Sequence, residues 1–360
     1  MSQTTAQSLN EFIWHHSDDA SLQRVAPLLL GVAQACGQIA VAVRSAALQQ
    51  MTGAAGSDNI QGEAQQKLDV ISHDIMVAAT KDLARVLASE EVEHVIAGNP
   101  ESDLALVFDP LDGSSNLDVN ISVGSIFSIL SAPDEVSDEQ VCLQSGTRQL
   151  CAGYALYGPA TMLVITTGVA VNGFTFDEET GLFVLTHPNL RIAQQAKEFA
   201  INASNQRHWE WPIQAYIADC LAGAVGVRGR DFNMRWVASM VAEVHRILLR
   251  GGVFLYPADS RAKTQNGKLR LLYEANPMAM LVEVAGGAAS TGRMRLLDVQ
   301  PTHTHQRVPV ILGAKGEVAT IEGYFKQDTT QNGIEGNTKT GIPNSNSEKA
   351  HQTLFETLFN

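Results

Sequence analysis

Four short β-rich runs in the middle of the chain constrain its fold more than any other feature of the sequence. The runs "GYALYG", "TMLVITTG", "VAVNGFTFD" and "GLFVLTH" are separated by Gly-Pro, Asn-Gly and acidic turns, which predicts an antiparallel meander. From about Asn189 onward, helical and strand patterns alternate: "RWVASMVAEVHRILLR" has Trp236, Met240, Val244 and Ile247 on one helical face, "GVFLYP" is a strand, and "NPMAMLVEVAGG" is a helix that glycines close. These patterns predict two α/β layered domains, residues 1–190 and 191–324.

The stretch from Val25 to Val43 carries no charge and is nearly long enough to span a bilayer. Gly31, Gly37 and several Gln and Ala residues dilute it, which favours a buried or subunit-interface helix over a membrane span. The N-terminus contains acidic residues and no basic n-region, so it does not resemble a secretory signal or a transit peptide. We therefore expect a cytoplasmic protein without a membrane partner.

Two segments are too polar to form a core. Residues 49–67 combine Gly, Ser, Asn and Gln without apolar periodicity, which predicts a mobile loop. Apolar residues then recur at helical spacing from Asp69 to Leu87, which predicts an amphipathic helix. Residues 325–360 are nearly devoid of apolar side chains before a final "TLFETLF", which predicts a disordered tail, because little surface is available to offset chain entropy.

Charge and cysteine content narrow the class of protein. The net charge of -13 would repel nucleic acid and anionic lipid, and no basic patch compensates for it. A phosphorylated substrate would therefore need metal ions. The four cysteines, Cys36, Cys142, Cys151 and Cys220, form no C-x-x-C pair and fit free thiols in a reducing compartment better than a disulfide framework, a zinc site or a redox switch.

The stretch "FDPLDGSSN", residues 108–116, ends the apolar run "LALVF" with two carboxylates three residues apart. Because Asp, Pro and Gly break strands, the motif belongs at a strand end, where Asp109, Asp112 and a backbone carbonyl between them face one point. Hard oxygen ligands of this kind suit Mg²⁺ or Mn²⁺. Gly113, Ser114 and Ser115 add N–H and hydroxyl groups that suit a phosphate. The motif predicts adjacent metal and phosphate sites.

Further carboxylates are candidates to complete the cluster: Glu63, Asp69, Glu90, Glu91 and Glu274. Two or three metal ions held by such a set would neutralise a phosphoryl group and acidify a water molecule, which implies hydrolysis of a phosphate monoester.

Each of these features also has a plain structural interpretation. An isolated D-P-x-D-G is a turn in most proteins, and a Glu-Glu pair is usually a solvated helix end. His245 is expected to be a surface residue or a hydrogen-bonded structural one rather than a metal ligand. Arg261, Lys263, Lys268 and Arg270, taken alone, are expected to form a solvated rim.

Several long blocks decide between these interpretations. "FDPLDGSSNLDVNISVGSIFSI", "AGYALYGPATMLV", "MRWVASMVAEVHRILLRGGVFLYPA" and "NGKLRLLYEANPMAMLVEVAGGAASTG" closely resemble class I fructose-1,6-bisphosphatase, over about Asp58 to Leu312. The shorter D-P-x-D-G is shared with inositol monophosphatases. The resemblance implies an α-β-α-β-α layered sandwich, the sugar phosphatase fold.

The resemblance also assigns roles to residues near the motif. Glu90, Asp109, the carbonyl of Leu111, Asp112 and Glu274 match the family's ligands for two or three Mg²⁺ ions, with Mn²⁺ as an alternative. Gly113, Ser114 and Ser115 match the loop that holds the sugar 1-phosphate together with the metals. Asp69 and Glu91 match carboxylates that position and deprotonate the attacking water, and Glu63 matches the acidic residue of the mobile loop.

Around the distal 6-phosphate and the sugar, the matching residues are Asn202, Arg235, Met240, Tyr256 and Lys268. In the family, the arginine at the position of Arg235 reaches into the site of a neighbouring subunit, which implies a homotetramer.

Departures from the family pattern affect substrate range and regulation. Trp236 and Asn205 stand where tyrosines are usual, and an indole donates only one hydrogen bond, so a rebuilt pocket that admits sedoheptulose bisphosphate is an open alternative.

The segment "SDDASLQRV" and the pair Asp103-Leu104 replace AMP-binding elements, which predicts weak or absent AMP inhibition.

We therefore predict Mg²⁺-dependent hydrolysis of fructose 1,6-bisphosphate to fructose 6-phosphate, in gluconeogenesis or the Calvin cycle. The alternatives are a sedoheptulose-1,7-bisphosphatase or dual-specificity enzyme, an inositol monophosphatase-like enzyme, and a non-catalytic sensor. A sensor would have lost ligands, whereas each expected side-chain ligand position here holds a carboxylate.

Overall fold

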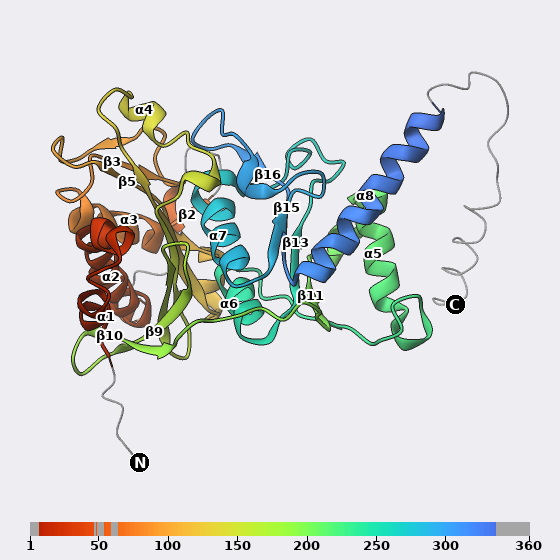
Figure 1. Ribbon diagram of the computed structural model, residues 1–360, viewed down its shortest axis with the longest axis horizontal. Coiled ribbons are helices and arrows are strands. Elements are labelled where there is room, and N and C mark those ends of the chain that lie inside the picture. The colour runs from red at the N-terminus through yellow and green to blue at the C-terminus, as the bar shows by residue number, and fades with distance from the viewer. Residues whose placement is uncertain (1–6, 47, 49–53, 59–63, 336–360) are drawn as a thin grey trace, which may run out of the picture.

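The computed structural model describes residues 7–46, 48, 54–58 and 64–335. Within this part of the chain, three layers of helices alternate with two layers of sheet (Figure 1). The expected α-β-α-β-α sandwich is therefore confirmed. The predicted division near residue 190 falls between the last strand of the first sheet and the first strand of the second.

The first sheet has eight strands in the order β10-β9-β8-β7-β6-β5-β3-β4 among the described residues. Its neighbours pair antiparallel, except that β3 and β5 run parallel. The predicted meander forms β7 to β10. The strands are β3 (Val86–Ser89), β4 (Ile96–Ala97), β5 (Leu104–Asp112), β6 (Val123–Ser131), β7 (Cys151–Tyr157), β8 (Thr161–Thr166), β9 (Val171–Asp177) and β10 (Leu182–His187).

The helices α1 (Leu9–His15), α2 (Ala20–Ser45) and α3 (Lys67–Thr80) cover the outer face of this sheet. By length and composition α2 is apolar enough to cross a membrane, but 67% of its most apolar window is buried inside the protein. It is thus a core helix, as the glycines and glutamines in it indicated. The helix predicted from Asp69 to Leu87 is too long: α3 ends at Thr80, because the next apolar residues belong to a turn and to β3.

The middle layer consists of α6 (Met240–Arg250) and α7 (Asn276–Val284), which pack between the two sheets. Their apolar residues form one continuous core with β6, β7, β13 and β17. Trp236 was expected on the helical face of α6, but it precedes the helix, whose N-cap is Ser239. A single π-helical turn, η5 (Leu271–Ala275), leads into α7.

The second sheet has five strands in the order β12-β11-β13-β17-β15 within the described residues. They are β11 (Glu198–Ala200), β12 (Asn233–Met234), β13 (Val253–Tyr256), β15 (Ala288–Ser290) and β17 (Val310–Gly313). The outer helices α5 (Trp211–Leu221) and α8 (Lys315–Glu335) form the last layer. Because α8 continues to Glu335, part of the segment predicted to be disordered is helical; residues 336–360, including "TLFETLF", lie outside the described residues.

Two short strand pairs complete the chain. β14 (Leu269–Arg270) pairs with β16 (Arg307–Val308), and β1 (Ala54–Asp58) pairs with β2 (Ala64–Gln66). The second pair lies in the segment for which we predicted a mobile loop, so regular structure is present there. The remaining short elements are η1 (Ser114–Val119), α4 (Asp138–Val141), η2 (Gly146–Arg148), η3 (Ala203–His208), η4 (Gly223–Val225) and η6 (Leu296–Asp298).

The cysteines are free and buried, as expected for structural thiols. Burial raises the pKa of Cys36, Cys142 and Cys151 to about 12, which keeps these thiols protonated and unreactive.

Candidate active site

A β-bulge brings the two carboxylates of the DPLD motif to one side of β5. Residues three apart in a regular strand point to opposite faces. Here Asp109 pairs with Ile126 but Asp112 pairs with Gly124, so β5 contains one extra residue between them. The Ser125 hydroxyl donates a hydrogen bond of 2.7 Å to the Pro110 carbonyl inside the bulge, and the Leu111 N–H donates one of 2.9 Å to Asp109 Oδ1. Because of this extra residue, the carboxylates of Asp109 and Asp112 can point to the same side of β5.

Glu274 joins this pair from a distant segment of the chain. Carboxylate oxygens of Asp109, Asp112 and Glu274 all lie within 4.8 Å of one another, and all three side chains are buried. The π-helical turn η5 carries Glu274, whose Oε2 accepts a 2.6 Å hydrogen bond from the Arg270 N–H. Two acidic side chains from β5 and one from the distant turn η5 therefore meet at one point.

Burial and mutual repulsion raise the pKa values of these carboxyl groups. The pKa of Asp109 is raised well above its usual value, first by desolvation and then by Glu90, Asp112 and Glu274. Burial, again the largest cause, raises the pKa of Asp112 to about 6 and the pKa of Glu274 to about 8. Buried anions at such short distances need positive charge, and hard oxygen donors suit Mg²⁺ or Mn²⁺. The residues present therefore fit a divalent cation.

Glu90 lies beside the cluster at the end of β3. Its Oε1 is 2.8 Å from Nη1 of Arg270, and both side chains are buried. Arg270 was expected in a solvated rim, and that expectation is wrong. Arg270 belongs to β14, and the pairing of β14 with β16 holds its guanidinium beside the carboxylates.

The N-terminus of α6 fixes the other end of the motif. Asp112 Oδ2 accepts hydrogen bonds from the Ser239 hydroxyl at 2.8 Å and from the Val241 N–H at 2.9 Å. Gly113 has φ +75, and a Cβ atom there would stand 2.7 Å from Ser239 Cβ. Ser114 and Ser115, which begin η1, are thereby held beside the carboxylates. Their hydroxyl and N–H groups can bind an anion.

One cavity of about 380 Å³ collects nearly all the predicted site residues. Its lining includes the metal-ligand, water-positioning, phosphate-loop and sugar positions, namely Asp69, Glu90, Glu91, Asp109, Leu111, Asp112, Gly113, Ser114, Ser115, Asn202, Met240, Tyr256, Lys268 and Glu274. Glu63 lies outside the described residues. Arg235 does not line the cavity of its own chain; its Nε lies 3.7 Å from Glu198 Oε1.

The wall of the cavity away from the carboxylates is aromatic. The Trp236 ring is parallel to that of Phe254, with centroids 6.2 Å apart, and its centroid lies 6.1 Å from that of the tilted Tyr256 ring. Lys268 Nζ lies 5.8 Å from the centre of the Tyr256 ring. This wall combines one ammonium group with flat apolar surfaces, which suits a sugar with an anionic end.

The sequence interpretation missed Arg270, Ser239 and Phe254 as parts of this site. A serine directly before an amphipathic helix is an N-cap signal, so Ser239 was detectable. His245 agrees with its structural interpretation, since its Nδ1 shares a 2.9 Å hydrogen bond with the Tyr154 hydroxyl.

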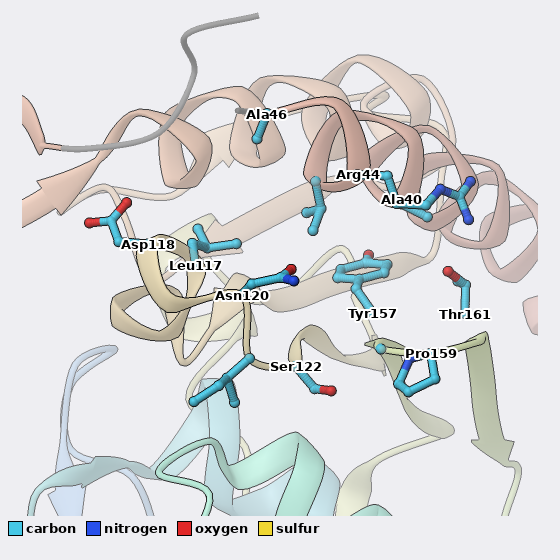
Figure 2. Close-up of a pocket in the computed structure, with 13 residues that line it drawn as sticks. Ala40, Arg44, Ala46, Leu117, Asp118, Asn120, Ser122, Tyr157, Pro159 and Thr161 are labelled. Atoms are coloured by element: carbon cyan, nitrogen blue, oxygen red, sulfur yellow. The ribbon is translucent and has the colours of Figure 1, made fainter. Parts of the chain in front are cut away.

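A second cavity, of about 880 Å³, lies between the C-terminal end of α2 and the far end of η1 (Figure 2). Asp118 is the one carboxylate in its described lining, and Tyr157 stands in its wall. The Tyr157 hydroxyl lies 2.7 Å from Ser125 Oγ, behind the bulge of β5. Although this cavity is larger, it lacks converging carboxylates, so the smaller one is the candidate active site.

Comparisons with known proteins agree over most of the chain. Two family models match, "Fructose-1-6-bisphosphatase, N-terminal domain" at residues 7–188 and "Fructose-1-6-bisphosphatase, C-terminal domain" at residues 192–326. A curated relative from Methylobacillus flagellatus, described as "Fructose-1,6-bisphosphatase class 1", is 56% identical over 321 residues, covering 88% of this chain and 97% of the relative.

Solved structures give the same picture. Leishmania major fructose-1,6-bisphosphatase in its holo form is similar with a TM-score of 0.83 and 37% identity, covering 89% of this chain and 99% of that one. The T-state structure of the same enzyme matches with a TM-score of 0.78 and 36% identity, at the same coverage.

Proposed function

The chain belongs to the fructose-1,6-bisphosphatase family, and on this premise we propose that it removes the 1-phosphate of fructose 1,6-bisphosphate in a reaction that depends on Mg²⁺. The observation that carries the proposal is the cluster of three buried carboxylates, Asp109, Asp112 and Glu274, beside the Gly113–Ser115 turn. Oxygen donors in this arrangement suit two or three Mg²⁺ ions, with Mn²⁺ as a substitute.

The residues at the metal end have separate tasks. Glu90, Asp109, Asp112, Glu274 and the Leu111 carbonyl hold the cations. When bound, the cations neutralise charge on the phosphoryl oxygens and make a nearby water more acidic. The Ser114 and Ser115 hydroxyls and N–H groups hold the phosphate in place. Asp69 and Glu91, which line the same cavity, orient the attacking water and accept its proton.

The residues at the other end select the sugar. Asn202, Met240, Tyr256 and Lys268 line that part of the cavity and contact the sugar and its 6-phosphate. Arg235, whose side chain is 49% exposed outside the cavity of its own chain, completes the site of a neighbouring subunit in a homotetramer.

Phosphate release from fructose 1,6-bisphosphate, measured with Mg²⁺ and with EDTA, tests the proposal. We expect release only with the cation, and loss of turnover in Asp112→Asn. Asp118→Asn is the matched control, because Asp118 lies in the adjoining turn but lines the second cavity. Release that persists in EDTA, or full activity of the Asp112→Asn variant, would contradict the proposal.

A dual-specificity enzyme is the second candidate, and Trp236 is the observation that favours it. The indole is parallel to the Phe254 ring and offers a single N–H donor. The aromatic wall therefore restricts the position of the distal phosphate little. Turnover of sedoheptulose 1,7-bisphosphate within tenfold of that of the fructose substrate would support the candidate. The fructose activity fits gluconeogenesis in the cytoplasm, and the dual activity fits the Calvin cycle.

A further inference from the structure

His73 lies outside the cavity but contacts one residue of β3 and one of β5, each of which directly precedes a carboxylate of the site. Its Nδ1 is 2.8 Å from the hydroxyl oxygen of Ser89, the residue before Glu90 and Glu91. Its ring stacks on Phe108, the residue before Asp109, with centroids 6.0 Å apart and planes 29° apart. One imidazole therefore touches the residue before the Glu90–Glu91 pair and the residue before Asp109.

The helix that carries His73 also carries Asp69. The two residues are four apart in α3, which places them on one face of the helix, one turn from each other. Asp69 is buried in the wall of the cavity, whereas His73 is half-buried behind it. The contacts of His73 with Ser89 and Phe108 thus also set the position of Asp69 relative to Glu91.

The hydrogen bonds behind the site continue into the backbone of the Glu90–Glu91 turn. Ser89 Oγ accepts the Glu91 N–H at 3.3 Å, and the Glu90 N–H donates to the Phe108 carbonyl at 3.1 Å. Ser89 itself is buried and lies opposite Phe108 in the parallel pair of β3 and β5. His73, Ser89 and Phe108 therefore form one support behind the carboxylates of three elements.

We propose that His73 is a positioning residue for the hydrolytic reaction, acting through Ser89 and Phe108 to hold Asp69, Glu90, Glu91 and Asp109 in register. The inference rests on the proposed function for its kinetic meaning. Burial lowers the pKa of His73, so the ring is neutral at neutral pH and serves as a fixed hydrogen-bonding group. Groups that orient metal ligands from behind typically affect activity or metal affinity by about 10- to 100-fold when removed.

Two substitutions at His73 distinguish the effect of its hydrogen bond to Ser89 from the effect of its ring packing on Phe108. His73→Asn keeps a polar atom near the place of Nδ1, so it should retain kcat within about threefold, whereas His73→Phe keeps the ring on Phe108 but loses the bond. For His73→Phe we expect kcat to fall at least about 10-fold with KM for fructose 1,6-bisphosphate within about twofold, because the phosphate and sugar residues are untouched. Ser89→Ala removes the other end of this bond and also the acceptor of the Glu91 N–H, so its kcat should fall at least as far as that of His73→Phe.

His245→Phe is the structural control, because it removes a comparable imidazole–hydroxyl bond, to Tyr154, away from the carboxylates. It should lower Tm without the selective loss of kcat. Equal kcat losses in His73→Phe and His245→Phe, or a His73→Asn variant as impaired as His73→Phe, would overturn the inference.

A readout without turnover separates this inference from the proposed function. The rise in Tm on adding MgCl₂ should be smaller in His73→Phe and Ser89→Ala than in the unsubstituted chain and in His245→Phe. If the unsubstituted chain released no phosphate, the proposed function would fail, while the Mg²⁺ shifts would still test the positioning role. Identical shifts in all four proteins would count against it.

Discussion

Arg270 Nη1 lies 2.8 Å from Glu90 Oε1, and both groups are buried beside Asp109 and Glu274. The guanidinium thus supplies the positive charge next to a cluster of acids that repel one another. Removing one partner of a buried ion pair leaves an uncompensated charge and typically costs about 3–5 kcal/mol. This pair should therefore support the fold most strongly when no cation is bound.

We accordingly expect Arg270→Met to lower the free energy of unfolding by about 3 kcal/mol in EDTA. Mg²⁺ should recover part of that loss, because the cation replaces the missing positive charge. Urea unfolding with EDTA and with MgCl₂ measures both values. Arg295→Met is the control, because the Arg295 side chain is 46% exposed and its pairs with Glu283 and Asp298 should each be worth at most about 1 kcal/mol. Equal losses in the two variants would show that the Arg270 pair has no special role.

Gly113 is expected to tolerate no side chain. Its φ of +75 disfavours any L-residue, and a Cβ would stand 2.7 Å from Ser239 Cβ at the N-cap of α6. Gly113→Ala should cost about 1–2 kcal/mol for the backbone and a further 1–3 kcal/mol for the contact, with loss of phosphate release. Gly181→Ala is the matched control, because its φ is +70 and nothing lies within 4 Å of the added atom. Its loss should be limited to about 1–2 kcal/mol. Thermal unfolding of the two variants, run side by side, distinguishes the two costs.

The raised pKa values predict how pH affects the metal-free protein. The folded-state pKa of Glu274 is about 8 and that of Asp112 about 6, against 4.5 and 3.8 for free side chains. The folded chain then binds these protons more tightly than the unfolded chain does. Their contribution to stability is complete below about pH 4 and is lost as pH rises to about 8.

A bound cation should reverse this dependence, because it favours the ionised carboxylates. We therefore expect the rise in Tm caused by Mg²⁺ to be larger at about pH 8 than at about pH 6. Calorimetry at the two pH values, with MgCl₂ and with EDTA, checks the sign. A Mg²⁺ effect that shrinks with rising pH would contradict the assignment of these groups as ligands.

Local sequence patterns located the carboxylates but not the groups that hold them. Asp109 and Asp112 were predictable because strand breakers follow an apolar run. The extra residue in β5 depends on the register with β6, which the motif alone does not reveal. Arg270 resembles a surface residue in sequence, and its burial follows from pairing with Arg307 in a distant segment. The early end of α3 at Thr80 was missed because Leu83 and Val86 continue the helical spacing while packing as turn and strand.

Mixed oligomers test whether Arg235 acts across subunits. Asp112→Asn disables the cavity of its own chain but leaves Arg235 in place, whereas Arg235→Ala leaves the cavity intact. Each variant alone should be inactive or nearly so. If two subunits exchange Arg235 reciprocally, random pairing of equal amounts should restore about one quarter of the sites. Phosphate release after dissociation and reassembly of the mixture, compared with each variant treated alone, measures this recovery. The structure gives a reason to expect it, because Arg235 does not line the cavity of its own chain and lies near Glu198 with half of its side chain exposed. Arg235→Ala with full activity, or a mixture no more active than its components, would show that each site is complete within one chain.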